Sequence, residues 1–412
     1  MARNKNRAAD PGVRPVIKAE LSEKNRTLRL VLIIVFVLIA LFSFYFGIKA
    51  VLEPETGWGE VDVAATKVNC SSDFIFSYCF GRDGNNPTKE EKYLIALYSD
   101  LSESAYQIFY NGLVSVNDAP NRVVTVDPAL YEALSLIKQY GNRSLYLAPV
   151  YLEYDRIFQS ASEVEAAAYD PAQTAEVAAY VGQIAAFAND PEMIDLELMD
   201  NNQVRLVVSD AYLAFSQENE ITVFTDFGWM RNAFIIDYFA DALIEAGFTN
   251  GFISSYDGFT RNLDTSGEMF SLNLFDRQDS SIYLPGTMQY SKPISIVFLR
   301  DYPMSQRDSF HYYTFTNGRI VSSYLDAADG MSKCAVDSLT GYSYNAGCAQ
   351  ILLQQIPVFI ADSWNEASVS AMAQSGVYSI WFEGTSVYCN DADMSIQLNS
   401  DSGIDYQVVY TD

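Results

Sequence analysis

Residues Thr225–Phe259 read TDFGWMRNAFIIDYFADALIEAGFTNGFISSYDGF and predict a helix between two strands. The preceding ITVFTD is typical of a strand, and Asp226 is placed to cap the turn into a helix from Trp229 to Ala246. The face expected to be buried comprises Phe234, Ile235, Tyr238, Phe239, Ala242 and Leu243. Gly247 supplies a left-handed exit before the next strand, TNGFISSY. This stretch therefore predicts a strand–helix–strand unit at the centre of the fold.

Further helices are indicated by their start signals. Thr88 opens a capping-box pattern before KYLIALYSDLSESAYQIF, a helix that Asn111–Gly112 is expected to stop. At residues 127–128 and again at 170–171, an Asp-Pro pair places an N-cap and a first-turn proline before an apolar run. These signals predict at least three helices besides the central one.

Strand-like runs follow the helices: VRLVVSD, ISIVFL, YYTFT and YSIWFEG. Helices and strands are both abundant, but they do not alternate regularly along the chain. The predicted fold class is therefore α+β. Residues 73–412 are enough to bury a large core, which we expect to form two lobes.

The N-terminal part contains a membrane-length segment. Leu30–Ile48, LVLIIVFVLIALFSFYFGI, has nineteen residues and no formal charge. As a helix it would span roughly 28 Å, close to the hydrocarbon thickness of a bilayer. A cleavable signal peptide is the competing interpretation, but its apolar region is usually shorter, and no small-residue cleavage site follows Ile48. We therefore expect an uncleaved anchor in the lipid bilayer.

The charges on either side of this segment predict its orientation. Eight of the 26 basic residues and three of the 52 acidic residues precede Leu30, so the remainder carries a formal charge near −31. The positive-inside rule makes residues 1–29 a cytoplasmic tail and places everything beyond the anchor outside. We expect residues 49–72 to be a stalk and residues 73–412 an extracytoplasmic domain in the cell envelope. Its negative charge argues against nucleic acid as a partner.

Cysteine and histidine usage limits the chemistry of the outer part. The five cysteines have no CxxC spacing, and His311 is the only histidine, which argues against zinc sites and Ser–His or Cys–His hydrolysis. His311 lies among aromatic residues in SFHYYTF and is expected to be a packed or surface side chain of a strand. In an oxidising compartment we expect a Cys334–Cys348 disulfide, with Cys70–Cys79 the other local pairing. Five buried free thiols are the alternative.

The central stretch resembles the ApbE-type flavin transferase family. The family pattern Asp-Leu-Gly-Gly-Ile-Ala-Lys-Gly-Tyr-Ala-Val-Asp lies opposite Asp226–Asp237, DFGWMRNAFIID. SSYLDAADG at Ser322–Gly330 stands where the family has His-His-Ile-Ile-Asp-Pro-x-Thr-Gly, and AGCAQILLQQI from Ala346 resembles its Ala-Asp-Ala-x-x-Thr helix. The resemblance covers most of residues 73–390 and implies an ApbE-like fold. It also implies an enzyme that moves FMN from FAD onto a threonine or serine of a partner protein, using magnesium.

The sequence departs from the family at the residues on which this chemistry depends. The two magnesium ligands of the family, an Asp and a Thr, correspond to Gly347 and Ile351, which offer no ligand atom. The family lysine is replaced by Asn232, and the neighbouring Arg231 should point about 100° away from it on the helix. Tyr256 stands where a glycine would let a ligand approach the backbone. The resemblance thus implies a metal site that has been lost.

Three hypotheses about function remain open. The first is a degenerate flavin transferase that needs no cofactor and acts as a binding or scaffold component, with an envelope protein as partner. The second is an active transferase using FAD and Mg²⁺, with ligands supplied by Asp257, Asp326 or Asp329. The third is a structural envelope protein without a ligand. The candidate cofactor-binding residues implied by the resemblance are Asp226, Asn232, Tyr256, Asp257 and Asp326.

Overall fold

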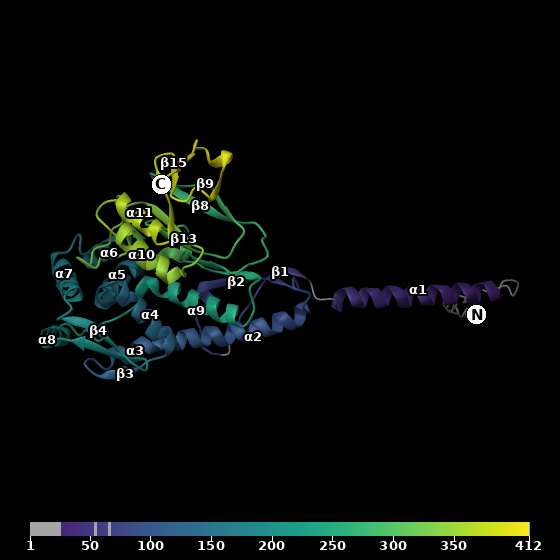
Figure 1. Ribbon diagram of the computed structural model, residues 1–412, viewed down its shortest axis with the longest axis horizontal. Coiled ribbons are helices and arrows are strands. Elements are labelled where there is room, and N and C mark those ends of the chain that lie inside the picture. The colour runs from purple at the N-terminus through teal and green to yellow at the C-terminus, as the bar shows by residue number, and fades with distance from the viewer. Residues whose placement is uncertain (1–25, 53–55, 65–66, 412) are drawn as a thin grey trace, which may run out of the picture. The chain divides into compact units, whose positions relative to one another are not determined.

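The computed structural model describes residues 26–52, 56–64 and 67–411, and it divides the chain into two units, 1–55 and 56–412. In the first unit, α1 (Arg26–Leu52) is one continuous helix (Figure 1). Its segment Leu30–Ile48 is long and apolar enough to cross a membrane, either as a signal sequence or as an anchor. The predicted cytoplasmic tail lies outside the described residues up to residue 25.

The second unit is built on a nine-stranded sheet. Every neighbouring pair in this sheet is antiparallel except β15–β17. The strands follow in the order β1 (Gly57–Glu60), β2 (Phe74–Phe80), β6 (Gly251–Ser255), β7 (Phe259–Asn262), β10 (Ile294–Arg300), β13 (Ser338–Ser343), β14 (Tyr378–Glu383), β15 (Ser386–Cys389) and β17 (Gln407–Tyr410).

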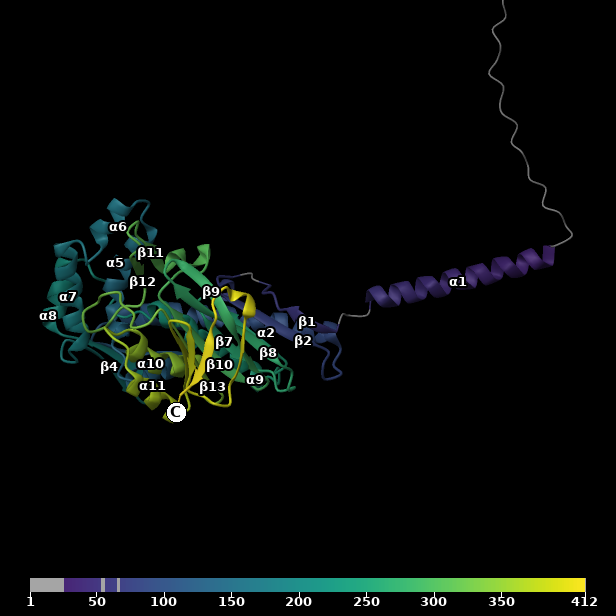
Figure 2. The same cartoon turned by 90° about the horizontal axis from the view of Figure 1, so that it is seen from above.

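Three helices cover one face of this sheet. Helix α9 (Arg231–Glu245) lies between α2 (Pro87–Tyr106) and α10 (Cys348–Phe359), and it contacts β6 and β7 (Figure 1). Figure 2 shows α10 beside α11 (Glu366–Gln374), next to β10 and β13. The central strand–helix–strand unit is therefore the middle of the sheet–helix interface.

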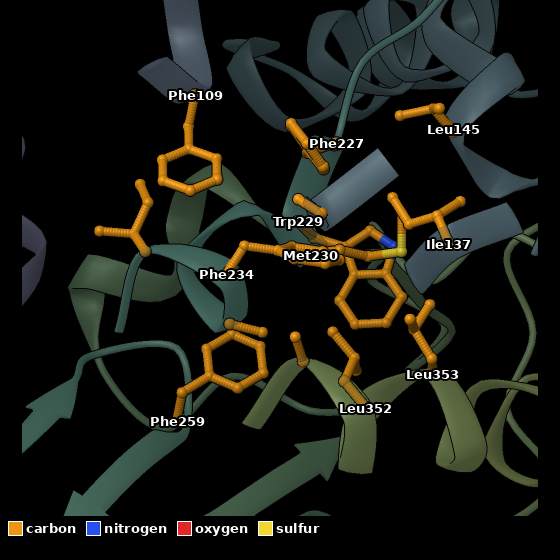
Figure 3. Close-up of a cluster of buried hydrophobic side chains, with 14 of the residues drawn as sticks. Phe109, Ile137, Leu145, Phe227, Trp229, Met230, Phe234, Phe259, Leu352 and Leu353 are labelled. Carbon is orange, nitrogen blue, oxygen red and sulfur yellow. The ribbon is translucent and has the colours of Figure 1, made fainter. Parts of the chain in front are cut away.

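The hydrophobic core lies on both faces of the sheet because successive strand residues point to opposite sides. On the helical face, Phe227, Met230 and Phe234 pack with Leu352 and Leu353 of α10 in one large cluster (Figure 3). On the other face, a second cluster includes alternate strand residues together with side chains of β8 and β9: Leu274, Met288, Ile294, Ile296, Tyr342 and Ile380. The two clusters belong to one unit, residues 56–412.

The remaining elements form smaller sheets and a helical layer. One three-stranded sheet has the order β3 (Val123–Thr125), β5 (Gln203–Val208), β4 (Ile194–Met199). A second has the order β16 (Ser395–Leu398), β9 (Ser281–Tyr290), β8 (Phe270–Gln278). A two-stranded sheet pairs β11 (Tyr312–Thr314) with β12 (Ile320–Ser322). The other α-helices are α3 (Gly112–Asn117), α4 (Pro128–Gln139), α5 (Ala148–Gln159), α6 (Glu163–Tyr169), α7 (Ala175–Asn189) and α8 (Asp210–Glu218).

Several predicted boundaries are wrong because another residue caps the helix or the chain continues. Helix α2 begins at Pro87, and Asn86 rather than Thr88 caps it by accepting from the Lys89 amide. Asn111–Gly112 does not stop the helix, which continues through a π-turn, η3 (Gln107–Asn111), into α3. The Asp-Pro cap at residue 127 is confirmed, since Asp127 accepts from the Ala129 amide. At residues 170–171 the same motif caps only a turn, because α7 starts at Ala175.

Two further predictions fail for tertiary reasons. ITVFTD, residues 221–226, forms no strand with any other described residue; instead Asn117 Oδ1 accepts from the amides of Phe224 and Thr225 at 2.9 Å each. Residues 57–60 of the predicted stalk are strand β1, because they add to the edge of the sheet beside β2. The domain therefore includes part of the segment assigned to the stalk.

The predicted disulfides are absent: all five cysteines are free. Cys348 Sγ donates instead to the backbone oxygen of Thr260, at 3.4 Å, beneath α10. Cys70 Sγ likewise donates to the Ser102 carbonyl at 3.4 Å, so Cys70 pairs with backbone rather than with Cys79. The structure agrees with the free-thiol alternative, with four of the thiols buried and Cys334 half-buried.

Candidate functional site

The turn into α9 is organised by Asp226. Its Oδ1 accepts from the Gly228 amide and from the Arg231 guanidinium, both at 2.6 Å. Gly228 has a φ of +55° and lies against the Tyr151 ring, where a Cβ would come within 2.9 Å, so glycine is required there. The turn thereby orients Arg231, whose guanidinium carbon lies 4.0 Å from the centre of the Tyr110 ring.

Beside this turn lies a cavity of about 390 Å³. It is formed where the start of α9, the β6–β7 turn, the 3-10 helix η2 (Ser71–Asp73) and the 3-10 helix η6 (Gln306–Phe310) meet. Its polar and charged lining comprises Asp73, Tyr110, Arg231, Asn232, Tyr256, Asp257, Arg307, Asp308 and His311. With Tyr110 of η3, chain segments from five parts of the sequence thus contribute to one site.

Asp257 has the most unusual environment in the cavity. Its Oδ2 accepts from Asn232 Nδ2 at 3.0 Å, while its Oδ1 is buried without a hydrogen-bond partner among the described residues. Burial raises the pKa of Asp257, and the neighbouring Ser255 and Asn232 side chains and His311 oppose this only in part. Asp257 therefore holds its proton more tightly than an ordinary aspartate does.

Tyr256 connects the two 3-10 helices at the mouth of the cavity. Its amide donates to the Asp73 carbonyl at 3.1 Å, and the Arg307 guanidinium lies 3.9 Å from the centre of its ring. Asp73 is partly buried here, which raises the pKa of its carboxyl group against the opposing charges of Arg231 and His311. Arginine on an aromatic face is typical of a stable, partly desolvated cation.

The structure brings together most of the residues implied by the resemblance. Asn232, Tyr256 and Asp257 line one cavity. Asp226 does not line it but binds Arg231, which does. Arg231 and Asn232, adjacent on α9, both line the cavity, and the long side chain of Arg231 folds back to Asp226. Asp326 does not join them, because it pairs with Lys333 at 3.1 Å.

The sequence reasoning missed Asp73, Tyr110, Arg307 and His311. His311 follows η6 and lines the cavity instead of lying within a strand. The available signal was that the only histidine of the chain stands four residues after an arginine. Nothing local to that segment indicated that it would fold over Tyr256.

The magnesium positions implied by the resemblance are filled by protein. Gly347 is the N-cap of α10, and Ile351 is fully buried in the core. Asp237 of α9 caps α10 by accepting from the amides of Cys348 and Ala349, each at 2.9 Å, and it forms an ion pair with Arg261. Both carboxylate oxygens of Asp237 are therefore occupied, and the guanidinium already supplies the positive charge.

These residues do not fit a magnesium ion. Magnesium requires several hard oxygen ligands in near-octahedral order. At this point a glycine, a buried isoleucine and a saturated carboxylate offer none without displacing Arg261. Within the described part of the chain, no group of three or more His, Cys, Asp and Glu side chains is placed to hold a metal ion.

Comparisons with known proteins identify the fold. No protein-family model matches this chain, and no curated protein matches it in sequence. Its structure matches the ApbE protein of Thermotoga maritima with a TM-score of 0.53 at 11% identity, covering 84% of this chain and 97% of that one. The flavin transferase ApbE of Vibrio cholerae gives a TM-score of 0.49 at 11% identity, covering 84% and 98%. The Thermotoga match confirms the α+β, ApbE-like fold that the resemblance implied.

Proposed function

We propose that this protein is a membrane-anchored, extracytoplasmic member of the ApbE fold that binds a ligand or a partner and does not carry out metal-dependent FMN transfer. The proposal concerns the outer unit, which has the ApbE-like fold and a charged cavity. It is the first of the three hypotheses that the sequence left open.

The observation that carries the proposal is the ion pair between Asp237 and Arg261 beside Gly347. Transfer of a phosphoryl group depends on a cation that neutralises charge as it develops. Here a guanidinium is bound to the carboxylate, both are mostly buried, and α10 donates two amides to the same carboxylate. A divalent cation would have to break this arrangement and leave Arg261 with only its longer contact to the exposed Asp241, at 3.5 Å, which is costly for a mostly buried charge.

The second hypothesis requires magnesium ligands from elsewhere, and the geometry does not favour them. Asp326 and Asp329 both pair with Lys333, at 3.1 and 2.8 Å. Asp257 is bound to Asn232, and burial raises its pKa, which makes it a poorer ligand for a hard cation. These three carboxylates are also divided between two places, because only Asp257 lines the cavity.

The third hypothesis, a protein without any ligand, explains the cavity poorly. In a purely structural role, the buried Oδ1 of Asp257 would lack a hydrogen-bond partner, and nothing would offset the resulting loss of stability. A binding role accounts for it, because a ligand would supply the missing partner.

The test measures flavin binding and transfer directly. The full chain is purified in detergent and titrated calorimetrically with FAD, with and without Mg²⁺, and a threonine-containing acceptor peptide is then examined by mass spectrometry for added FMN. We expect weak FAD binding that magnesium does not strengthen, and no modified peptide. The Vibrio cholerae transferase serves as the positive control. Micromolar FAD affinity that rises with magnesium, or a modified peptide, would refute the proposal in favour of the second hypothesis.

The anchored topology is part of the same proposal. The apolar segment Leu30–Ile48 and the basic residues before it support an anchor with its N-terminus in the cytoplasm. Single cysteines introduced at positions in the outer unit should react with a membrane-impermeant maleimide on intact cells, while one introduced before residue 25 should react only after lysis. Cleavage after the apolar segment, seen as a mature N-terminus near residue 50, would show a signal sequence instead.

A further inference from the structure

The cavity gathers two arginines and a histidine in a strongly acidic part of the chain. Arg231, Arg307 and His311 all line it, although the chain beyond residue 29 carries a formal charge near −31. Asp308, which also lines it, is engaged elsewhere by Arg300 at 2.7 Å and by the amides of Met304 and Ser305. The remaining acids at the cavity are Asp73 and Asp257.

Three buried polar atoms of the lining residues have no partner among the described residues. They are Asp257 Oδ1, Arg231 Nε and Trp229 Nε1. Buried polar groups without hydrogen bonds are rare in native proteins, and each one calls for a missing partner. The guanidinium N–H is a donor with no acceptor, and a protonated Asp257 would add another donor.

We propose that this cavity binds a small oxyanion, a phosphate or carboxylate group, which Arg231, Arg307 and His311 surround and to which the Asp257 carboxyl group donates a hydrogen bond. The inference rests on the proposed function, since it names the ligand class for a binding site that works without a metal. Guanidinium groups hydrogen-bond planar and tetrahedral oxyanions strongly in partly desolvated sites.

A protonated Asp257 would allow the cavity to bind an anion although an aspartate lines it. Burial raises the pKa of Asp257, so the group can remain neutral beside an anion and donate its proton in a hydrogen bond. Burial also raises the pKa of Asp73, which limits repulsion from the other acid in the cavity. Asn232 holds the second oxygen of Asp257 at 3.0 Å and leaves Oδ1 for the ligand.

The three basic residues of the cavity differ in their exposure. Arg231 forms an ion pair with Asp226 and lies over the ring of Tyr110, and its side chain is only 19% exposed. Arg307 and His311 lie at the more open side, on and after η6. The two outer residues can therefore be substituted without disturbing the core, which makes them the better test positions.

The experiment titrates the full chain in detergent with inorganic phosphate and, separately, with acetate, at constant ionic strength set by sodium chloride. Saturable binding of at least one of them is expected, and the tighter of the two identifies the phosphate or the carboxylate as the recognised group. Arg307→Gln and His311→Gln should each weaken that binding about tenfold. The matched control is Arg205→Gln, which removes a partly exposed arginine of β5 paired with Glu197 of β4 and should leave the affinity unchanged.

Two further variants test the role of Asp257. Asp257→Asn keeps a hydrogen-bond donor and can never be negatively charged, so it should tighten binding; Asp257→Leu has the same size but no donor and should weaken it. Circular dichroism and a thermal melt establish that each variant is folded. Absence of saturable binding, or equal affinities for Arg307→Gln and Arg205→Gln, would overturn the inference. Those outcomes leave the proposed function untouched, whereas FMN transfer with intact anion binding would overturn only the proposed function.

Discussion

The carboxylate of Asp237 fills the space beside the α-carbon of Gly347. A Cβ at residue 347 would lie 2.7 Å from the Asp237 Cγ and 2.8 Å from its Oδ1, closer than side chains approach in proteins. Asp237 is on α9 and Gly347 is the N-cap of α10. The Asp237 side chain therefore links the two helices, because it accepts hydrogen bonds from the first amides of α10. The absence of a side chain at residue 347 is thus a packing requirement as well as the loss of a ligand.

Restoring the family residues at the two ligand positions should damage the protein. In Gly347→Asp with Ile351→Thr, the new carboxylate meets the Asp237 carboxylate and a buried isoleucine is lost. We expect a loss of roughly 3 kcal/mol or more in the free energy of unfolding, and no gain of magnesium-dependent transfer. Urea unfolding and FMN transfer assays measure the two effects. A stable double variant that binds magnesium would show that the ion pair is not what excludes the metal.

Removing the internal cation should destabilise the helix junction. In Arg261→Met, the Asp237 carboxylate loses its ion pair in a site where both side chains are less than one-fifth exposed. We expect a loss of roughly 2–3 kcal/mol in the free energy of unfolding. Arg205→Met, which breaks a more exposed pair with Glu197, should cost less than about 1 kcal/mol. Equal losses in the two variants would contradict the importance of the Asp237–Arg261 pair.

A pH dependence of stability should arise from Asp301. Burial raises its pKa to about 7, against the charge of Arg277 at 3.2 Å. The folded protein therefore holds this proton more tightly than the unfolded chain does, and the resulting stabilisation is complete below the ordinary aspartate pKa and is lost as the pH rises to about 7. The stability of the wild type relative to Asp301→Asn should fall by roughly 1–3 kcal/mol between pH 4 and pH 8. Urea unfolding at both pH values measures this difference, and a constant difference would contradict the shifted pKa.

The five thiols should remain unpaired and slow to react in the folded protein. Burial raises the pKa of Cys70 to about 12 and also raises that of Cys348, so little reactive thiolate exists at neutral pH. Iodoacetamide should label all five cysteines in urea, and Cys70 and Cys348 far more slowly in native buffer. Intact mass spectrometry without reductant reports the disulfides: a mass lower by two hydrogens would contradict the free-thiol assignment.

The sequence predicted those parts of the fold that depend on near neighbours along the chain. The apolar face of α9 follows from helical spacing, and the predicted face residues Phe234, Ile235, Phe239 and Leu243 are buried. Gly247 has the predicted left-handed backbone, with a φ of +84°. Asn232, Tyr256 and Asp257 could be placed near one another because a single helix and a single strand separate them.

Only the tertiary structure decided which distant residues complete the site. Arg307 and His311 enter the cavity because η6 packs beside the β6–β7 turn, a contact that no local pattern encodes. Asp237 caps a helix that starts 111 residues later, and Asn117 replaces a strand partner for Thr225 across 108 residues. Caps, turns and periodic faces arise from interactions within about four residues, so the sequence specifies them directly. The charge balance of the cavity and the filling of the metal position arise from packing between elements, and they exist only once the chain has folded.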